Sequence, residues 1–298
     1  GRLRFFAVNL STRNRTTPAA SGVGSGPALN VSEPMVLDSA NNRLLVADAN
    51  NQSGVVLSIN LSNGNRQVVS GFNTQTSTLV GAGTTFLSPV SLRFDSARNA
   101  VLIADGSRNA LFLVDLTTGA RTLASGTDPG TLQSVGSGPA FRQPVGADFV
   151  GDQQAVVLDE AMETAFLVDL VTGDRQLLPG NAIGSGPRLE TPRSFALDGD
   201  HWLVADSEVN ALMAIDVASG DRSVLLDGDT SLLQNPRAIV LDNARQRAFV
   251  LDNIETAPRL LALDLQTRAL TVISGPDGAN TIGAGPALDD PETMVFDA

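Results

Sequence analysis

The stretch LLVAD at residues 44–48 decides the fold, because the chain repeats it four more times. Each copy is an apolar run that ends in an aspartate, and successive aspartates are 57, 54, 47 and 46 residues apart. A period of this length is typical of the four-stranded blades of a β-propeller. The other copies are VLIAD (101–105), AVVLD (155–159), WLVAD (202–206) and AFVLD (248–252).

Other short apolar runs surround each copy. In the fourth repeat, PRSFALD (192–198) precedes the signature and LMAIDV (212–217) follows it. A fourth run is shorter, as in RTLASG (121–126). Runs that are rich in Val, Ile and Leu and bounded by Gly and Asn are typical of strands. The pattern therefore predicts an all-β protein, a β-propeller whose blades hold about four antiparallel strands each.

The two ends of the sequence complete the predicted repeat. Residues 6–15 match a hairpin of third and fourth strands, and residues 291–297 match a first strand, although no signature run lies between them. We therefore expect six blades, with the two termini sharing the closing one, and a single domain over residues 1–298. The predicted blades are approximately 31–71, 86–126, 141–180, 189–228, 233–275, and 288–298 together with 1–21.

The turn between the third and fourth strands has its own signature. In DLTTGAR (115–121) a three-residue loop ends in glycine, which matches a type I turn followed by a left-handed residue. This register places Asp115 opposite Arg121 and predicts a cross-strand ion pair, repeated by later Asp and Arg residues. We expect these pairs to be structural.

Composition excludes several classes of protein. The 298 residues carry a net charge of −12, no Cys and no Lys, and only 4 % are aromatic. The absence of Cys rules out disulfides and thiolate metal sites. The acidic balance argues against nucleic acid as a partner, and no apolar run approaches the roughly 18 residues of a membrane-spanning helix. Without an initiator Met or a signal peptide, the sequence indicates a mature or trimmed chain, and we favour an exported, periplasmic or extracellular protein over a cytoplasmic one.

Two of the signature runs resemble the NHL repeat, whose hallmark is VAD followed by Ser or Gly, any residue, and Asn. They are residues 45–51 and 203–210, and the similarity extends to all five full repeats. The chain is thus similar to the superfamily of six-bladed propellers that includes the NHL-repeat proteins and the SMP-30/gluconolactonase-like lactonases. This resemblance implies the fold and only weakly an activity, because one fold hosts many functions.

The resemblance to the lactonases implies a divalent metal at the mouth of the propeller channel. Glu33, which directly precedes Pro34, resembles a metal ligand of that family, although the usual Glu lies one residue further back. Asn235 before Pro236 is the nearest match to the family's Pro-Asn-Gly segment, which is missing here. Oxygen ligands would suit Ca²⁺ or Mg²⁺. The single histidine, His201, begins a strand and is expected at the surface.

Candidate functional residues flank the prolines that open the first strands. We expect an acidic arc that holds the metal, if one binds, and a basic arc opposite to it that binds a ligand together with two amide side chains. The metal candidates are Glu33, Asp290 and Glu292, and the ligand-binding candidates are Arg193, Arg237, Asn235 and Gln143. The signature aspartates are predicted to fasten their own loops by accepting backbone N–H groups; they are Asp48, Asp105, Asp159, Asp206 and Asp252.

Two functions fit this pattern. The favoured one is a noncatalytic platform that binds a protein, a peptide or a small molecule on the face that carries the signature loops and the glycine-rich linkers, such as GSGP (136–139). These linkers lack the Lys and the following helix of a phosphate-binding loop, so they are predicted to be turns. The alternative is a metal-dependent lactonase-like hydrolase, in which Glu33 and Asp290 hold the metal and a bound water is the nucleophile.

Overall fold

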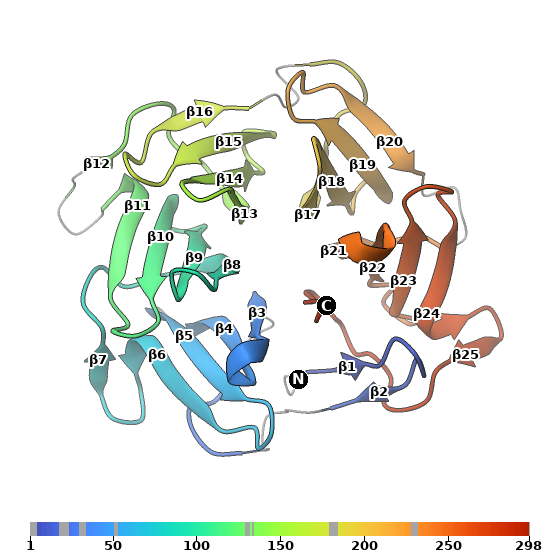
Figure 1. Ribbon diagram of the computed structural model, residues 1–298, viewed down its shortest axis with the longest axis horizontal. Coiled ribbons are helices and arrows are strands. Elements are labelled where there is room, and N and C mark those ends of the chain that lie inside the picture. Colours follow the sequence, from blue (N-terminus) through green and yellow to red (C-terminus); the bar gives the residue numbers. More distant parts are fainter. Residues whose placement is uncertain are drawn as a thin grey trace. The chain divides into compact units, whose positions relative to one another are not determined.

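The computed structural model describes most of the chain as short antiparallel strands (Figure 1). It forms two compact units, one made of residues 1–3 and 19–178 and the other of residues 4–18 and 179–298. Neither of the two 3₁₀ turns among the described residues approaches the length of apolar helix that crossing a bilayer takes. The described residues are 5–17, 24–29, 34–50, 53–128, 132, 134–178, 184–227 and 232–297.

The first unit contains three sheets, each of which follows the chain order. The first blade is β3 (Met35–Asp38), β4 (Arg43–Asn50), β5 (Ser53–Asn60), β6 (Arg66–Asn73) and β7 (Thr78–Val80), with the 3₁₀ turn η1 (Ser39–Asn41) after β3. The second blade is β8 (Pro89–Asp95), β9 (Ala100–Asp105), β10 (Ala110–Asp115), β11 (Arg121–Thr127) and β12 (Ser134–Val135). The third blade is β13 (Pro144–Val150), β14 (Gln154–Asp159), β15 (Thr164–Asp169) and β16 (Arg175–Leu177).

The second unit contains two full sheets and a small one. The fourth blade is β17 (Pro192–Asp198), β18 (His201–Asp206), β19 (Ala211–Asp216) and β20 (Arg222–Leu226). The fifth blade is β21 (Pro236–Asp242), β22 (Arg247–Asp252), β23 (Arg259–Asp264), β24 (Leu270–Asp277) and β25 (Asn280–Ile282), with the 3₁₀ turn η2 (Asn243–Arg245) after β21. The small sheet pairs β1 (Ala7–Val8) with β2 (Arg15–Thr16).

The fold is an all-β β-propeller with five blades, so the expectation of six blades was wrong. Residues 288–298 and 1–21 do not make a blade: the described residues there contain only the two-stranded sheet β1–β2, and residues 291–297 belong to no strand. The physical reason is the missing signature run. Without a second strand beside it, the first-strand-like segment has no ladder to join. Three of the five blades also gain a fifth strand, because β7, β12 and β25 form from the segments that follow the fourth strand.

Apolar side chains fill the space between consecutive blades within each unit. One core joins the first and second blades around Leu45, Phe86 and Phe112, and another joins the second and third blades around Leu102 and Phe166. In the second unit a core joins the fourth and fifth blades. The second strand of the second blade, β9, is apolar on both faces because it lies between two such layers, with Val101 and Ile103 in one and Leu102 and Ala104 in the other.

In every blade but the fifth, an arginine at the start of the fourth strand fastens it to a glycine-rich linker. The Arg121 side chain is 4 % exposed, and its Nε donates to the carbonyl of Thr84 at 2.9 Å. Its two Nη groups donate to the carbonyls of Val80 and Gly83 at 2.9 Å and to Ser70 Oγ on the neighbouring blade at 2.8 Å. Since the guanidinium offers five donors in a fixed plane, one side chain satisfies several buried carbonyls at once.

The same contact recurs in three other blades and in the small sheet β1–β2. The Nε groups of Arg66, Arg175, Arg222 and Arg15 donate to the carbonyls of Pro27, Pro139, Pro187 and Pro286, respectively. The fifth blade has Leu270 at the equivalent position, opposite Leu263, and no such linker precedes it. Arginine and linker therefore occur together within this chain.

The linkers need glycine because the backbones touch. Gly81 and Gly83 have φ of +73° and +96°, a region that side chains disfavour. A Cβ atom on Gly81 would lie 1.8 Å from the carbonyl oxygen of Gly119, and one on Gly83 would lie 2.0 Å from that of Arg121. Only glycine lets the linker approach close enough for its carbonyls to reach the guanidinium.

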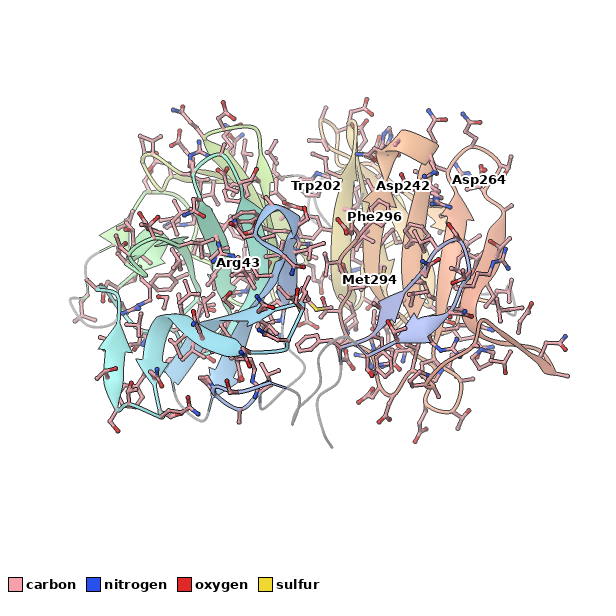
Figure 2. The ribbon with its side chains drawn as sticks, turned by 60° about the horizontal axis from the view of Figure 1, so that its bottom comes forward. Arg43, Trp202, Asp242, Asp264, Met294 and Phe296 are labelled. Carbon is pink, nitrogen blue, oxygen red and sulfur yellow. The ribbon has the colours of Figure 1, made fainter. Side chains whose placement is uncertain are left out.

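Asp115 and Arg121 do not form the expected ion pair with each other. Asp115 Oδ1 instead accepts the N–H groups of Thr117 and Thr118, at 2.7 and 2.8 Å, and so fastens its own turn. Asp169, Asp216 and Asp264 do the same in later blades (Asp264 is labelled in Figure 2). Asn60 supplies the same acceptor through its amide oxygen.

Replacing Arg121 tests the buried contact. We expect Arg121→Lys to lower the free energy of unfolding by at least about 2 kcal/mol, because one ammonium cannot satisfy the carbonyls and hydroxyl that the guanidinium binds. Urea unfolding followed by circular dichroism measures this. Arg98→Lys is the matched control, since Arg98 pairs with Asp95 on the surface with 43 % of its side chain exposed, and it should change stability by no more than about 0.5 kcal/mol. Equal effects of the two changes would contradict the role of Arg121.

The turn aspartates predict a specific sensitivity to acid. The N–H groups of Thr118 and Thr117 lower the pKa of Asp115 in the folded state, and those of Thr172 and Val171 lower the pKa of Asp169. Stability from a lowered carboxyl pKa is complete above the unfolded value, about 4, and is lost as the pH falls through the folded value.

Asn60 shows that asparagine also fastens this turn, without titrating in this range. We therefore expect a variant with Asn at 115, 169, 216 and 264 to lose less stability between pH 6 and pH 3 than the wild-type chain does. Thermal melting at both pH values measures the difference. An identical loss in the two proteins would show that other groups govern the acid transition.

Candidate functional site

The signature aspartates fasten the starts of the first strands. Asp105, at the end of β9, is fully buried, and its carboxylate accepts the N–H groups of Leu87 and Ser88 at 2.7 and 3.1 Å. These are the two residues before Pro89, which opens β8. Each aspartate thus holds the proline-led segment against the end of the second strand.

Three further blades repeat this contact with different residues before the proline. Asp159 binds the N–H groups of Arg142 and Gln143, Asp206 those of Glu190 and Thr191, and Asp252 those of Gln234 and Asn235. Asp48 is likewise buried, 1 % exposed. Its equivalent partners precede Pro34 and lie outside the described residues, as does the metal candidate Glu33.

In the second unit, three of the four ligand candidates and two of the three metal candidates form one polar cluster. Arg237, next to Pro236 at the start of β21, has Nη1 3.5 Å from Glu292 Oε2. Its Nε is buried and has no hydrogen-bond partner among the described residues. Arg193, at the start of β17, is exposed and donates from Nε to Ser207 Oγ at 3.1 Å. The acidic and basic residues that we expected on opposite arcs are therefore in contact within this unit.

Asn253 connects the other residues of the cluster, and the sequence did not predict this role. Its Nδ2 donates to Asp290 Oδ1 at 2.8 Å and to Glu292 Oε1 at 3.4 Å, while its own carbonyl accepts from Asn235 Nδ2 at 2.6 Å. The side chain follows the signature aspartate Asp252 directly. The same position holds Gly106, Glu160 and Ser207 in other blades. This variation beside a constant aspartate is the sequence feature that could have pointed to Asn253 as a functional residue.

The charges around Glu292 oppose one another. Burial raises the pKa of the Glu292 carboxyl, the Arg237 guanidinium lowers it, and the Asp290 carboxylate raises it further, with a net upward shift. Arg193 and the Asn253 amide act in the lowering direction. Glu292 is therefore a partly desolvated acid whose charge depends on its neighbours.

The remaining candidate residues lie apart from this cluster. Gln143 belongs to the first unit, where its amide donates to the carboxylate of Glu160. His201 lies at the opposite end of β18 from Asp206, with 47 % of its side chain exposed and its Nδ1 2.8 Å from Asp200 Oδ1. A polar cavity of about 250 Å³ lies in the first blade. It is lined by Asn41, Arg43, Ser58, Asn60, Asn63, Asn65 and Gln67.

Two of the three metal candidates, Asp290 and Glu292, lie in this cluster, and the third, Glu33, lies outside the described residues. In this structure the two carboxylates accept from the Asn253 side-chain N–H, and Glu292 also pairs with the Arg237 guanidinium. Within the described ranges, no three acidic or histidine side chains come together in a way that could hold a metal ion. The positive charge beside these carboxylates comes from arginine.

Comparison with known proteins supports the fold and gives no evidence for a particular activity. No family model matches the chain, and no curated protein matches it. Among solved structures 693 chains are similar, which is too many to indicate one activity. One is a chain in a crystal structure of a nidogen/laminin complex, with a TM-score of 0.62, 12 % sequence identity, and coverage of 95 % of this chain and 90 % of that one. The kinship with NHL-repeat and SMP-30-like proteins thus stays a prediction.

Titration of variants can measure separately the opposite effects of Arg237 and Asp290 on the pKa of Glu292. Because Arg237 lowers and Asp290 raises the pKa of Glu292, we expect Arg237→Gln to shift this pKa upward and Asp290→Asn to shift it downward. Carbon-13 NMR of glutamate-labelled protein measures both shifts, and the Glu292→Gln spectrum assigns the resonance. Arg98→Gln, a surface change, should leave the value alone. Shifts of the same sign in both variants would contradict the arrangement.

Proposed function

We propose that this protein is a noncatalytic binding platform, and that the cluster of Arg193, Arg237, Asn235, Asn253, Asp290 and Glu292 is where it binds its ligand. The observation that carries the proposal is the partly exposed Arg237–Glu292 pair, whose side chains are 25 % and 35 % exposed. Both residues flank prolines, and the β21 loop is fastened by Asp252. A rigid site with both charges available suits recognition.

The ligand class follows from these charges. Arg193 is exposed and the Arg237 side chain is 25 % exposed, so an incoming carboxylate would find two guanidinium groups. Asp290 and Glu292 would meet a positive group beside it. We therefore favour a peptide or protein segment that carries both charges over an uncharged small molecule. The nidogen/laminin complex, which has a similar fold, is itself an assembly of proteins, and this adds support for a protein partner.

Peptide selection tests the platform. We would select from a displayed library of random 12-residue peptides on the wild-type protein, then measure the enriched peptides by calorimetry. We expect enriched sequences to carry acidic residues, and we expect Arg193→Gln with Arg237→Gln to weaken binding at least about tenfold, the loss of one or more charge-assisted hydrogen bonds.

Two controls make this result interpretable. Arg98→Gln removes a surface arginine outside the cluster and should leave the affinity unchanged. Arg193→Gln alone changes an exposed side chain, so it should weaken binding without altering the melting temperature. If the enriched peptides bind the double variant as well as the wild type, the cluster is not the binding site.

The sequence also raised a lactonase-like hydrolase that uses Ca²⁺ or Mg²⁺, and calcium calorimetry on the same proteins separates the two ideas. Binding of calcium that is lost in Asp290→Asn with Glu292→Gln would favour the hydrolase. Peptide binding that is indifferent to millimolar calcium supports the platform.

A further inference from the structure

The polar cavity in the first blade is built on the neighbouring strands β4, β5 and β6. Arg43 of β4 lies opposite Asn60 of β5, and Ser58 of β5 lies opposite Gln67 of β6. Partners across a sheet project to the same face, and so do residues two apart along a strand. These four side chains therefore share one face of the blade, and all four line the cavity, whose volume is about 250 Å³.

Arg43, labelled in Figure 2, is the only charged residue among the described residues of that lining. Its Nε donates to Asp38 Oδ2 at 2.7 Å, and this aspartate is buried, 1 % exposed. The two Nη groups of Arg43 have no partner among the described residues, and 21 % of the side chain is exposed. Asp38 thus holds the guanidinium by one edge and leaves the Nη donors available to a ligand.

The turn between β5 and β6 supplies three more donors. Asn60 Oδ1 accepts the N–H of Ser62 at 2.9 Å, and Asn63 Oδ1 accepts that of Asn65 at 2.9 Å. Asn65 Oδ1 in turn accepts the N–H of Ser25 at 2.8 Å. Because backbone N–H groups occupy these amide oxygens, the Nδ2 groups of the same side chains are left as donors, and none of them donates to a described residue. All three asparagines line the cavity.

Later blades carry carboxylates where the first blade carries two of these amides. An aspartate takes the place of Asn60 in the four later blades and fastens the same turn. Asp174 takes the place of Asn65 in the third blade, where it accepts the Ser137 N–H at 2.6 Å, and Asp221 does so in the fourth. An amide keeps the acceptor that the turn needs and replaces a negative oxygen with an NH₂ donor. In a chain of net charge −12, the described lining of this cavity thus contains no carboxylate.

The hydroxyl of Ser58 is a second departure from the repeat. Strand register gives the residues at the equivalent place in the later blades, and all of them are apolar: Leu113, Leu167, Ala214 and Ala262. The blade therefore folds with an apolar residue at this place. A hydroxyl here adds a group that can donate or accept in the cavity without being required by the fold.

We infer that this cavity binds a small tetrahedral oxyanion, a phosphate or sulfate group. The donors come from more than one direction, since Arg43 belongs to β4 and the asparagine amides to the turn. A tetrahedral anion offers oxygens in several directions, whereas a carboxylate offers two in one plane, which the guanidinium fork alone would satisfy. The cavity is smaller than the pockets that hold drug-sized ligands, which suits a small anion. This inference does not rest on the proposed function.

Inorganic phosphate and inorganic sulfate are the probes. They are titrated separately into nitrogen-15-labelled protein at pH 7, with the ionic strength held constant by sodium chloride. Each should shift the side-chain amide signals of Asn60, Asn63 and Asn65 saturably, with a dissociation constant of about 1 mM. Acetate should bind at least about tenfold more weakly. The tighter of the two inorganic anions identifies the group that a natural ligand carries.

Asn60→Asp with Asn65→Asp is the decisive variant. Other blades use aspartate at both places, so the turn keeps its acceptors and the melting temperature should stay the same at pH 7. The affinity for phosphate should fall at least about tenfold, because two donors become negative oxygens. The matched control is Asn9→Asp with Asn14→Asp, which adds the same charge at the same two turn positions of the small sheet β1–β2, outside the cavity lining. It should leave the affinity unchanged.

Two further variants define the test. Arg43→Gln would leave the buried carboxylate of Asp38 without its ion partner and so destabilise the blade, which is why the asparagine variant is preferred. Arg193→Gln with Arg237→Gln should leave the phosphate-induced shifts intact, which separates this cavity from the charged cluster of the second unit.

Three outcomes would overturn the inference. They are no saturable shift up to about 20 mM phosphate or sulfate, equal phosphate affinity of the wild type and the variant with Asp at 60 and 65, and acetate binding as tight as phosphate binding. An equal loss of affinity in the control with Asp at 9 and 14 would also refute it, because overall charge rather than the cavity would then govern binding.

Discussion

A guanidinium with carbonyl partners holds the fourth strand of a blade to its glycine-rich linker, and Arg121 and Arg175 also bind a serine of the blade before their own. Arg121 satisfies carbonyls of the preceding linker and a serine of the neighbouring blade at the same time, so strand, linker and neighbour become one hydrogen-bonded unit. Its described partners are carbonyl groups and a hydroxyl rather than a carboxylate, and burial lowers its pKa. Such a contact works only if the linker backbone approaches very closely, which is why Gly81 and Gly83 flank it.

In four blades a buried aspartate fastens the start of the first strand, just as the arginines fasten the linkers. A carboxylate that accepts two N–H groups fixes the segment before the proline, and the residue types in that segment are then free to vary. Ser88, Gln143, Thr191 and Asn235 occupy equivalent places with different chemistry. The scaffold therefore separates the residues that build it from those that distinguish one blade from the next.

The second unit departs most from the repeat, and the departures gather in one region. It has Leu270 in place of the linker arginine, Asn253 beside its aspartate, and a C-terminal segment that packs without pairing. Asp290 and Glu292 belong to that same segment.

Much of the fold was determined by sequence alone, because period and strand chemistry are local properties. The signature runs, the proline-led first strands and the glycine turns lie where the repeat places them. The charged cluster was partly predictable, since Arg237 and Glu292 were singled out by their place beside prolines. Its connection through Asn253 was not, because an amide after a strand carries no signal until its neighbours are known.

What only the tertiary structure decided concerns partners that are distant in the chain. From their spacing in the sequence, Arg121 and Asp115 are expected to form an ion pair. In the structure Arg121 instead binds carbonyls about forty residues earlier in the chain. The local sequence does not show that such distant carbonyls will bind the arginine in place of the aspartate. The blade count was decided in the same way. A first-strand sequence at 291–297 predicts a strand, yet a strand exists only where a neighbour offers it a ladder, and here the described chain supplies none.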